Sequence, residues 1–293
     1  MTGIICINKP QDFTSFDVVA IMRGCFHTKK VGHGGTLDPM ATGVLPVFVG
    51  GATKAVDLLP DSAKSYRAGF RLGYTSVTQD IWGKLAAQSS GSASEDAVQC
   101  AMEQFRGDIM QIPPMYSALK VNGQKLCDLA RKGIEVERQP RPISITRLEL
   151  LSFDGTDGVL EVDCSSGTYI RTLIHDIGAV LGTGAVMTSL CRTRSHGYSL
   201  EQCLTIDEVK SLGEQQLNER LLPVESAFAS LPAVHLNEVQ QRMYLNGVRL
   251  DADRLSQRPQ TGVLCRVLAA GEFLGVARVS EQNELVGVKR FMS

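Results

Sequence analysis

The chain has 293 residues, of which 43% are hydrophobic, and a formal net charge of −1 at pH 7. This length is enough for about two domains with a sizeable core. The near-neutral charge excludes a protein drawn to nucleic acid by overall charge alone. No apolar run approaches the length of a membrane span, and residues 1–4 carry no positive cluster. We therefore expect a cytoplasmic protein with no membrane association.

The 8 cysteines are scattered along the chain. No two of them have Cys-x-x-Cys spacing, so the pattern favours neither a disulfide framework nor a zinc site. In a cytoplasmic chain we expect them to be reduced and to behave as small core residues. No metal ligands are predicted.

The chain begins with two regular elements. Residues 3–10 predict a buried strand that Pro10 ends. Thr14 or Ser15 is placed to cap a helix that runs through residues 18–22.

Residues 32–45 form the most distinctive stretch of the chain. Five of these fourteen residues are Gly or Pro, which indicates a shaped loop. Asp38 is its only carboxylate, and Pro39 disfavours a helical backbone at Asp38. Residues 44–49 then read as a buried strand. One carboxylate on a shaped, anchored loop suits catalysis. The pattern alone also fits a plain turn, and it lacks the Gly-Lys-Ser/Thr of a phosphate-binding loop.

Three segments follow before a linker. Residues 52–59 predict a short helix stopped by Pro60, and residues 64–73 alternate as in a half-buried strand. Residues 74–80 read as a polar loop, and residues 88–94 as a linker of small residues.

The next predicted helix begins at a capping-box pattern, Ser92 with Glu95, and reaches Phe105. Residues 112–120 then read as extended, before a turn at residues 122–123.

A short helix over residues 125–132 is closed by Gly133. Two strands are expected at residues 143–153 and 159–164, joined by a turn. The segment 166–171 leads into a helix over residues 172–181, which puts Arg171 at a strand-to-helix junction.

Beyond Pro232 the sequence predicts mainly short strands, which indicates a small β-rich domain. Its predicted elements are a helix at residues 238–245 and strands at residues 263–268, 272–279 and 285–291.

Residues 116–147 are locally basic. They contain seven basic and three acidic residues, so this surface can bind phosphate although the whole chain is near neutral. Counting charges alone equally fits a solvated face. The basic residues are Lys120, Lys125, Arg131, Lys132, Arg138, Arg141 and Arg147.

Residues 35–45, Gly-Thr-Leu-Asp-Pro-x-Ala-x-Gly-Val-Leu, resemble the signature loop of the TruB family of tRNA pseudouridine synthases. The catalytic residue of that loop in the family corresponds to Asp38. Further motifs that resemble those of the family follow in the same order as in the family, over about the first two hundred residues. These are Tyr66-Arg67 (active-site Tyr motif), residues 113–120 (RNA-contacting insertion), residues 164–171 (second catalytic segment) and Leu190 before Arg192. The family's loop often has Thr where this chain has Gly34, so the hydroxyl contact that such a Thr could make is missing here.

The resemblance implies an α+β protein with the pseudouridine synthase fold. A mixed central β-sheet flanked by helices would form the catalytic domain over residues 1–232, with an RNA-binding insertion at about residues 107–133. Residues 233–293 resemble a small PUA-like RNA-binding domain less closely. The insertion is expected to be mobile without RNA and to close over the substrate.

The implied reaction converts uridine 55 in the TΨC loop of tRNA to pseudouridine, by base flipping and by breaking and re-forming the base–ribose bond. No net redox change or group donor is involved, so no cofactor is expected. The implied partner is tRNA, with no obligatory protein partner, and the chain is expected to be a monomer.

The reaction needs a carboxylate facing an electron-poor carbon, and an aspartate is ionised at neutral pH. We assign this role to Asp38. We expect the Arg171 guanidinium to hold that carboxylate with two parallel hydrogen bonds. Tyr66 offers a stacking face for the flipped base, and its hydroxyl is placed to help remove the C5 proton.

The resemblance implies contacts to RNA for several other residues. His33 would wedge into the RNA loop, Tyr169 would buttress the site, and Leu190 would pack near the uracil. The basic residues assigned to RNA binding are Lys120, Lys125, Arg131 and Lys132.

Each assignment has a plainer structural alternative. Arg171 also fits an exposed residue at a helix start, and Tyr66 and Leu190 fit plain core residues. Phe16 and Met40 are expected in the core. At the level of function, the alternatives are a non-catalytic RNA-binding or tRNA-folding module and an RNA-guided pseudouridine synthase.

Overall fold

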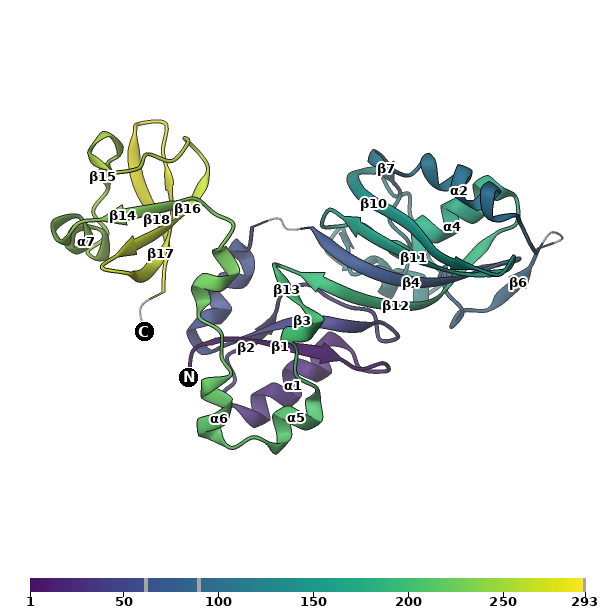
Figure 1. The fold of residues 1–293 in the computed structure, drawn as a ribbon, viewed down its shortest axis with the longest axis horizontal. Helices are drawn as coiled ribbons and strands as arrows, with labels where there is room; N and C mark the ends of the chain where they lie inside the picture. Colours follow the sequence, from purple (N-terminus) through teal and green to yellow (C-terminus); the bar gives the residue numbers. More distant parts are fainter. Residues whose placement is uncertain (61–62, 89–90, 292–293) are drawn as a thin grey trace.

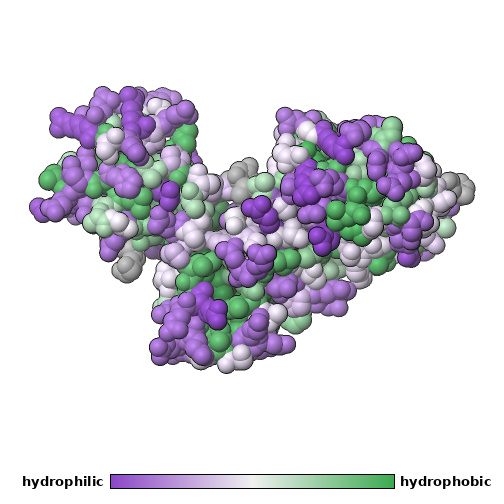
Figure 2. Space-filling model, in the orientation of Figure 1, coloured by the Kyte–Doolittle hydropathy of each residue, from purple (hydrophilic) through white to green (hydrophobic). Residues whose placement is uncertain are grey.

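The computed structural model describes residues 1–60, 63–88 and 91–291. Two sheets organise the chain, one of nine strands and one of five strands. Figure 1 shows the five-stranded sheet set apart from the large one. Hydrophilic residues cover much of the visible surface of both regions (Figure 2).

The first elements agree closely with the sequence-based expectation. The predicted cap is Thr14, whose hydroxyl accepts from the Asp17 amide. The helix predicted at residues 52–59 is a 3-10 helix that begins earlier. The elements are β1 (Gly3–Lys9), α1 (Ser15–Cys25), β2 (Val31–His33), β3 (Thr42–Val49) and η1 (Gly50–Leu58).

The expectation that Phe16 is buried is wrong. Its side chain is exposed on α1, where the Arg23 guanidinium lies 5.3 Å from the ring centroid. Met40 is partly buried and packs against the main core, as expected. The buried face of α1 consists of Ser15, Val18, Val19 and Met22, and Phe16 lies outside it.

Two details of the middle segment differ from the expectation. Residues 74–80 include a short strand, and the cap of the next helix is Ser94, whose hydroxyl accepts from the Ala97 amide, rather than Ser92. Part of the predicted linker, residues 89–90, lies outside the described residues. The elements are β4 (Lys64–Leu72), β5 (Tyr74–Ser76), β6 (Leu85–Ala87), α2 (Glu95–Glu103) and β7 (Gly107–Gln111).

The expected insertion has two parts. Its first residues form β7, which pairs with the next long strand and so belongs to the large sheet. The rest folds on a small hydrophobic cluster of Met115, Leu126 and Leu129. It contains β8 (Lys120–Val121), β9 (Gln124–Lys125) and α3 (Leu126–Arg131), and both turn residues between β8 and β9 have positive φ.

The two predicted strands and the following helix are confirmed, but the structure adds a long strand, β12, that the sequence analysis missed. The elements are β10 (Arg141–Phe153), β11 (Asp157–Cys164), α4 (Ile170–Leu181), β12 (Ala185–Ser195), β13 (Tyr198–Ser199), η2 (Leu200–Gln202), α5 (Ile206–Ser211), α6 (Glu214–Glu219) and η3 (Val224–Phe228).

β12 joins the two halves of the large sheet. It pairs antiparallel with β4 and parallel with β3, so the sheet is mixed, as expected. The parallel contact needs glycine at Gly43, because a Cβ there would overlap the Arg192 carbonyl oxygen. α4 packs on β12 and α2 packs on α4, so these helices cover one face of the sheet (Figure 1).

The C-terminal elements confirm the predicted helix and three strands and add a parallel strand, β14. Rings of Phe273 and Phe291 pack against Phe228, which joins this sheet to the rest of the chain. The elements are β14 (Ala233–Leu236), α7 (Glu238–Leu245), β15 (Leu250–Asp251), η4 (Ala252–Arg254), β16 (Leu264–Ala269), β17 (Glu272–Val279) and β18 (Glu284–Arg290).

All eight cysteines are free thiols, of which Cys6, Cys164 and Cys265 are buried while Cys100 is exposed. Within the described ranges, no helix has both the length and the apolar character to cross a membrane.

Candidate active site

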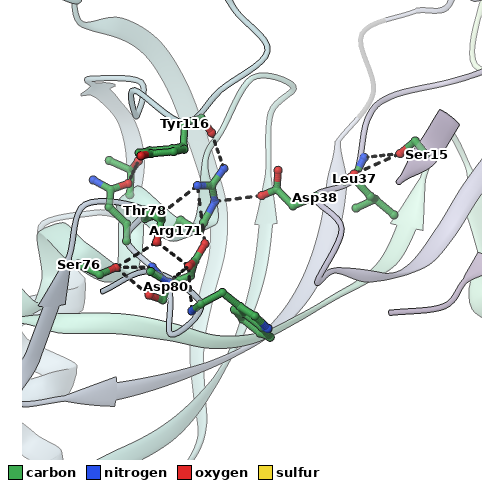
Figure 3. A network of polar contacts seen from close by, with 12 residues as sticks. Ser15, Leu37, Asp38, Ser76, Thr78, Asp80, Tyr116 and Arg171 are labelled. Carbon is green, nitrogen blue, oxygen red and sulfur yellow. Dashed lines mark hydrogen bonds and ion pairs between the residues drawn. The ribbon is translucent and has the colours of Figure 1, made fainter. Parts of the chain in front are cut away.

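Asp38 and Arg171 form an ion pair. The Arg171 Nε lies 3.0 Å from the Asp38 Oδ2, although 133 positions separate them in the sequence (Figure 3). Asp38 lies on the loop between β2 and β3, and Arg171 is in the first turn of α4. The Arg171 side chain is only 6% exposed, against 37% for Asp38. The expected pairing is therefore confirmed, and the carboxylate remains open to a ligand.

The expectation of two parallel hydrogen bonds from Arg171 to Asp38 is wrong. Nη1 donates to the Thr78 carbonyl oxygen and Nη2 donates to the Tyr116 carbonyl oxygen, each at 2.9 Å. Only Nε faces Asp38. The guanidinium has five N–H groups in a fixed plane, and here it spreads them over three segments. This fixes the cation from several sides.

Asp80 is a second carboxylate beside Arg171 that the sequence analysis did not single out. Its Oδ2 lies 3.9 Å from Arg171 Nη1. Its Oδ1 accepts from the Thr78 hydroxyl at 2.7 Å and from two backbone amides that follow it. A buried carboxylate is costly without partners, and the only sequence signal was an acidic end to a polar loop.

Lys9 anchors the loop that carries Asp38. Its fully buried Nζ donates to the carbonyl oxygens of Pro10, Phe13 and Pro39, at 2.9, 2.6 and 3.0 Å. Burial lowers the pKa of Lys9 to about 8, and the negative charge of Asp38 partly opposes that shift. The chain next to Asp38 is thus tied to the end of β1.

Arg192, on β12, anchors the other side of the same loop. It is 1% exposed, and its guanidinium donates to the carbonyl oxygens of Val44, Gly35 and Thr36, at 2.8, 3.1 and 3.4 Å. Burial lowers the pKa of Arg192. Neither Arg192 nor Lys9 was assigned a role from the sequence, because carbonyl acceptors leave no pattern in it.

Ser15 completes the support of the loop. Its hydroxyl accepts from the Leu37 amide at 2.8 Å and donates to the Leu37 carbonyl oxygen at 3.2 Å (Figure 3). Asp38 therefore follows a residue whose backbone groups are both held from α1.

Five of the predicted site residues line one pocket of about 320 Å³. That volume is at the small end of the usual range for ligand sites. Residues 112–136, which contain β8, β9 and α3 and pack on the Met115–Leu126–Leu129 cluster, are called the 112–136 segment. Residues from the Asp38 loop, from β4, from the 112–136 segment, from α4 and from β12 meet in the pocket. The predicted residues among them are Asp38, Tyr66, Tyr169, Arg171 and Leu190.

Tyr66 lies on β4, where it is paired in register with Arg192 of β12. The side chain is 7% exposed and lines the pocket. Burial raises the pKa of Tyr66, and the nearby Arg192 guanidinium opposes that rise without cancelling it. The hydroxyl is therefore a neutral phenol at pH 7.

Tyr169 precedes α4 and is fixed through its backbone. Its amide donates to the Gln111 Oε1 at 2.8 Å, and its carbonyl oxygen accepts from the Gln111 Nε2 at 3.1 Å. Leu190, on β12, is 8% exposed and presents an apolar surface to the pocket.

The structure places His33 and Gly34 outside the lining of this pocket. His33 ends β2, and burial followed by the Arg192 charge lowers its pKa. A Cβ on Gly34 would meet ring and methyl carbons of Phe48 and Leu59 at 3.1 and 3.3 Å, so a larger residue there would need small shifts in an apolar environment.

The four predicted RNA-binding cations are all exposed on the 112–136 segment. Lys120 and Lys125 lie directly opposite each other across β8 and β9. Two positive charges in this position repel each other and destabilise the hairpin when no RNA is bound. Arg131 is 3.4 Å from Asp128 and lines a neighbouring pocket that Asp38 also lines.

Residues 23–170 match the family domain described as TruB family pseudouridylate synthase (N terminal domain), and residues 171–229 match the tRNA pseudouridylate synthase B C-terminal domain. The chain belongs to the TruB family. The tRNA pseudouridine synthase B of Clostridium tetani is 41% identical over 97% of both chains. That of Pseudomonas fluorescens Pf0-1 is 40% identical over 97% of this chain and 94% of its own length.

Solved structures confirm the fold of this TruB-family chain. It resembles a chain of a Cbf5-Nop10-Gar1 complex with a TM-score of 0.77 and 28% identity, over 99% of this chain and 84% of the other. It also resembles a chain of the archaeal box H/ACA sRNP Nop10-Cbf5 complex, with a TM-score of 0.73 and 27% identity over 99% and 85%. The expected pseudouridine synthase fold and enzymatic class are confirmed.

Proposed function

We propose that this TruB-family enzyme converts uridine 55 of the TΨC loop of tRNA to pseudouridine, with Asp38 as its catalytic carboxylate. The observation that carries the proposal is the ion pair of Asp38 with a buried Arg171 in a pocket lined by Tyr66. The curated relatives that match along almost the whole chain are named for tRNA.

The reaction breaks the bond between uracil N1 and ribose C1′ and forms a bond between C5 and C1′. N1 gains a proton and C5 loses one, so no redox partner is required. Asp38 supplies the negative charge that the electron-poor carbon needs. Arg171 holds that charge in place, and its own position is fixed by the Thr78 and Tyr116 carbonyl oxygens.

Tyr66 provides a face for the flipped uracil, and Leu190, on the neighbouring strand β12, adds an aliphatic surface to the same pocket. Base–aromatic stacking returns about 1–3 kcal/mol, comparable with the few kcal/mol that flipping costs. Because the phenol is neutral at pH 7, its oxygen takes the C5 proton only as its own proton passes to solvent water, and the proton that N1 gains from water balances it. Tyr66 is thus proposed as a proton relay.

Binding of the tRNA is assigned to two regions. In the catalytic part, residues 1–232, the exposed cations Lys120, Lys125, Arg131 and Lys132 would contact phosphates, and His33 would enter the RNA loop. Residues 233–293 would add further RNA contacts. The opposed lysines on β8 and β9 support this assignment, because a phosphate between them removes their repulsion. The enzyme is proposed to act as a cytoplasmic monomer without a cofactor.

An RNA-guided enzyme is the competing function, because the structural neighbours named above come from complexes with other proteins. Those neighbours are less similar in sequence than the curated tRNA enzymes. A direct test uses an unmodified tRNA transcript with tritium at C5 of its uridines. Release of one tritium per tRNA by the purified chain is expected. A transcript with cytidine at position 55 is the control, and no release from the naked uridine transcript would overturn the proposal.

A further inference from the structure

The only tryptophan of the chain is exposed on the loop between β5 and β6. Trp82 is 46% exposed, and its neighbours Val77 and Ile81 are also exposed, at 71% and 36%. We call these three residues the Trp82 platform. The three exposed apolar side chains fall within six residues of one loop, a concentration that can mark a binding surface, and the catalytic pocket does not include the platform.

The backbone under the platform is fixed. The amides of Trp82 and Gly83 both donate to Asp80 Oδ1, at 3.1 and 3.2 Å. The Ile81 amide donates to the Met187 carbonyl oxygen at 3.0 Å, which ties the loop to β12. These bonds preorganise the backbone that carries the indole. A preorganised aromatic group loses little freedom when it binds a partner.

The platform and the catalytic site share one loop. The same loop supplies the Thr78 carbonyl oxygen that Arg171 bonds (Figure 3). Thr78 and Asp80 line a pocket together with Asp38 and Arg131. Lys84, two residues after Trp82, is exposed, so the loop carries a cation close in sequence to the aromatic side chain. An aromatic face with a neighbouring cation is the combination that binds a nucleotide, through its base and its phosphate.

We propose that Trp82 stacks on a base of the RNA substrate outside the pocket that receives the target uridine. This inference rests on the proposed RNA substrate and adds a second point of contact to it. Stacking needs no base-specific hydrogen bond, so Trp82 contributes to affinity and to the placement of the RNA. The chemistry itself stays with the Asp38 pocket.

Fluorescence of the single indole tests the contact directly. The full chain with Asp38→Asn, which blocks turnover, is titrated with unmodified tRNA transcript while Trp82 emission and its quenching by acrylamide are recorded. Stacking predicts loss of emission and protection from acrylamide, both saturating with the bound fraction measured by filter binding. An emission that stays constant through saturation would overturn the proposal.

Kinetics separate stacking from a structural role. Trp82→Ala should raise the KM for tRNA by about fivefold to 150-fold, the effect of one lost base stack, and leave kcat within about twofold. Trp82→Phe should restore most of the affinity, because a ring remains. Val180→Ala is a matched control, since Val180 is also 46% exposed but lies on α4.

The outcomes are distinguishable. A normal KM for Trp82→Ala, or a loss confined to kcat, would refute the stacking contact. An equal loss in Trp82→Phe would do the same, since it would point to the indole as a structural group. If the parent enzyme released no tritium from tRNA but the emission still changed on binding, the proposed reaction would fail while this contact stood.

Discussion

The loop around Asp38 and the segment 112–136 border the same pocket, but they are held in opposite ways. The loop is held by buried side chains on three elements, Lys9, Ser15 and Arg192. The segment 112–136 folds on its own small cluster around Leu126 and carries its charges at the surface. A catalytic carboxylate needs a position fixed to a fraction of an ångström. A surface that binds a polyanion needs exposed positive charge, and its side chains need not be fixed as precisely.

The sharpest test of this comparison removes the charge of the loop without changing its shape. Asp38→Asn should abolish turnover, because no other carboxylate belongs to the loop, while tRNA affinity stays within a few fold. Single-turnover assays for pseudouridine and filter binding measure the two effects. Multiple turnover by the purified variant would remove Asp38 from the catalytic role.

The next test concerns the cation that meets the loop. Arg171→Lys keeps the charge but loses the planar group that bonds the Thr78 and Tyr116 carbonyl oxygens. We expect kcat to fall by about 10²–10³-fold, as for loss of an electrostatic donor.

Asp80→Asn tests the same network from its other carboxylate. We expect kcat to fall by about tenfold, less than for Arg171→Lys. The double variant Arg171→Lys/Asp80→Asn should lose less kcat than the product of the two single losses, because the two residues act as a unit. Fully multiplicative losses would show that Asp80 and Arg171 act independently.

Tyr66→Phe keeps the ring in the pocket and removes the hydroxyl. If the hydroxyl relays the C5 proton, kcat should fall by about 10²-fold or more, with tRNA affinity retained. Tritium release in single turnovers is the readout. A near-normal rate would reduce Tyr66 to a stacking face.

The affinity of the exposed cations of the 112–136 segment for tRNA should depend strongly on salt concentration. Alanine at Lys120, Lys125, Arg131 and Lys132 should reduce the slope of log affinity against log salt by about 0.7–0.9 for each lost phosphate contact. Alanine at the exposed Lys210 of α5 and at the exposed Arg220 that ends α6 is the control. An unchanged slope in the quadruple variant would show that the grip lies elsewhere.

The smallest expected effect is on stability, at the loop's buried anchor. Burial lowers the pKa of Lys9 from 10.5 to about 8, so the unfolded chain holds this proton more tightly than the folded chain. Burial of the protonated Lys9 lowers the free energy of unfolding. This cost is fully present below about pH 8 and is relieved as the pH rises from about 8 to about 10.5. Relative to Lys9→Met, the parent chain should therefore gain on the order of 1–3 kcal/mol of unfolding free energy over that window. Urea unfolding of both proteins at several pH values measures the difference, and a constant difference would contradict the burial effect.

Local signals in the sequence determined many elements of this fold. The cap at Thr14, the helix Glu238–Leu245 and the turn between β8 and β9 follow from residues a few positions apart. The same holds for the Asp38 loop, whose glycines and proline limit the backbone within fourteen residues. The order of family motifs then indicated which carboxylate to single out.

The tertiary structure decided what holds that carboxylate. Arg192 and the Val44 carbonyl that it bonds are 148 positions apart, and Arg171 reaches Thr78 across 93 positions. These acceptors are backbone carbonyl groups, which every residue has, so no residue pattern marks them. β12 was missed although it joins both halves of the large sheet. The sequence thus specified the proposed catalytic carboxylate, and the packing of distant strands and helices fixed the cations around it.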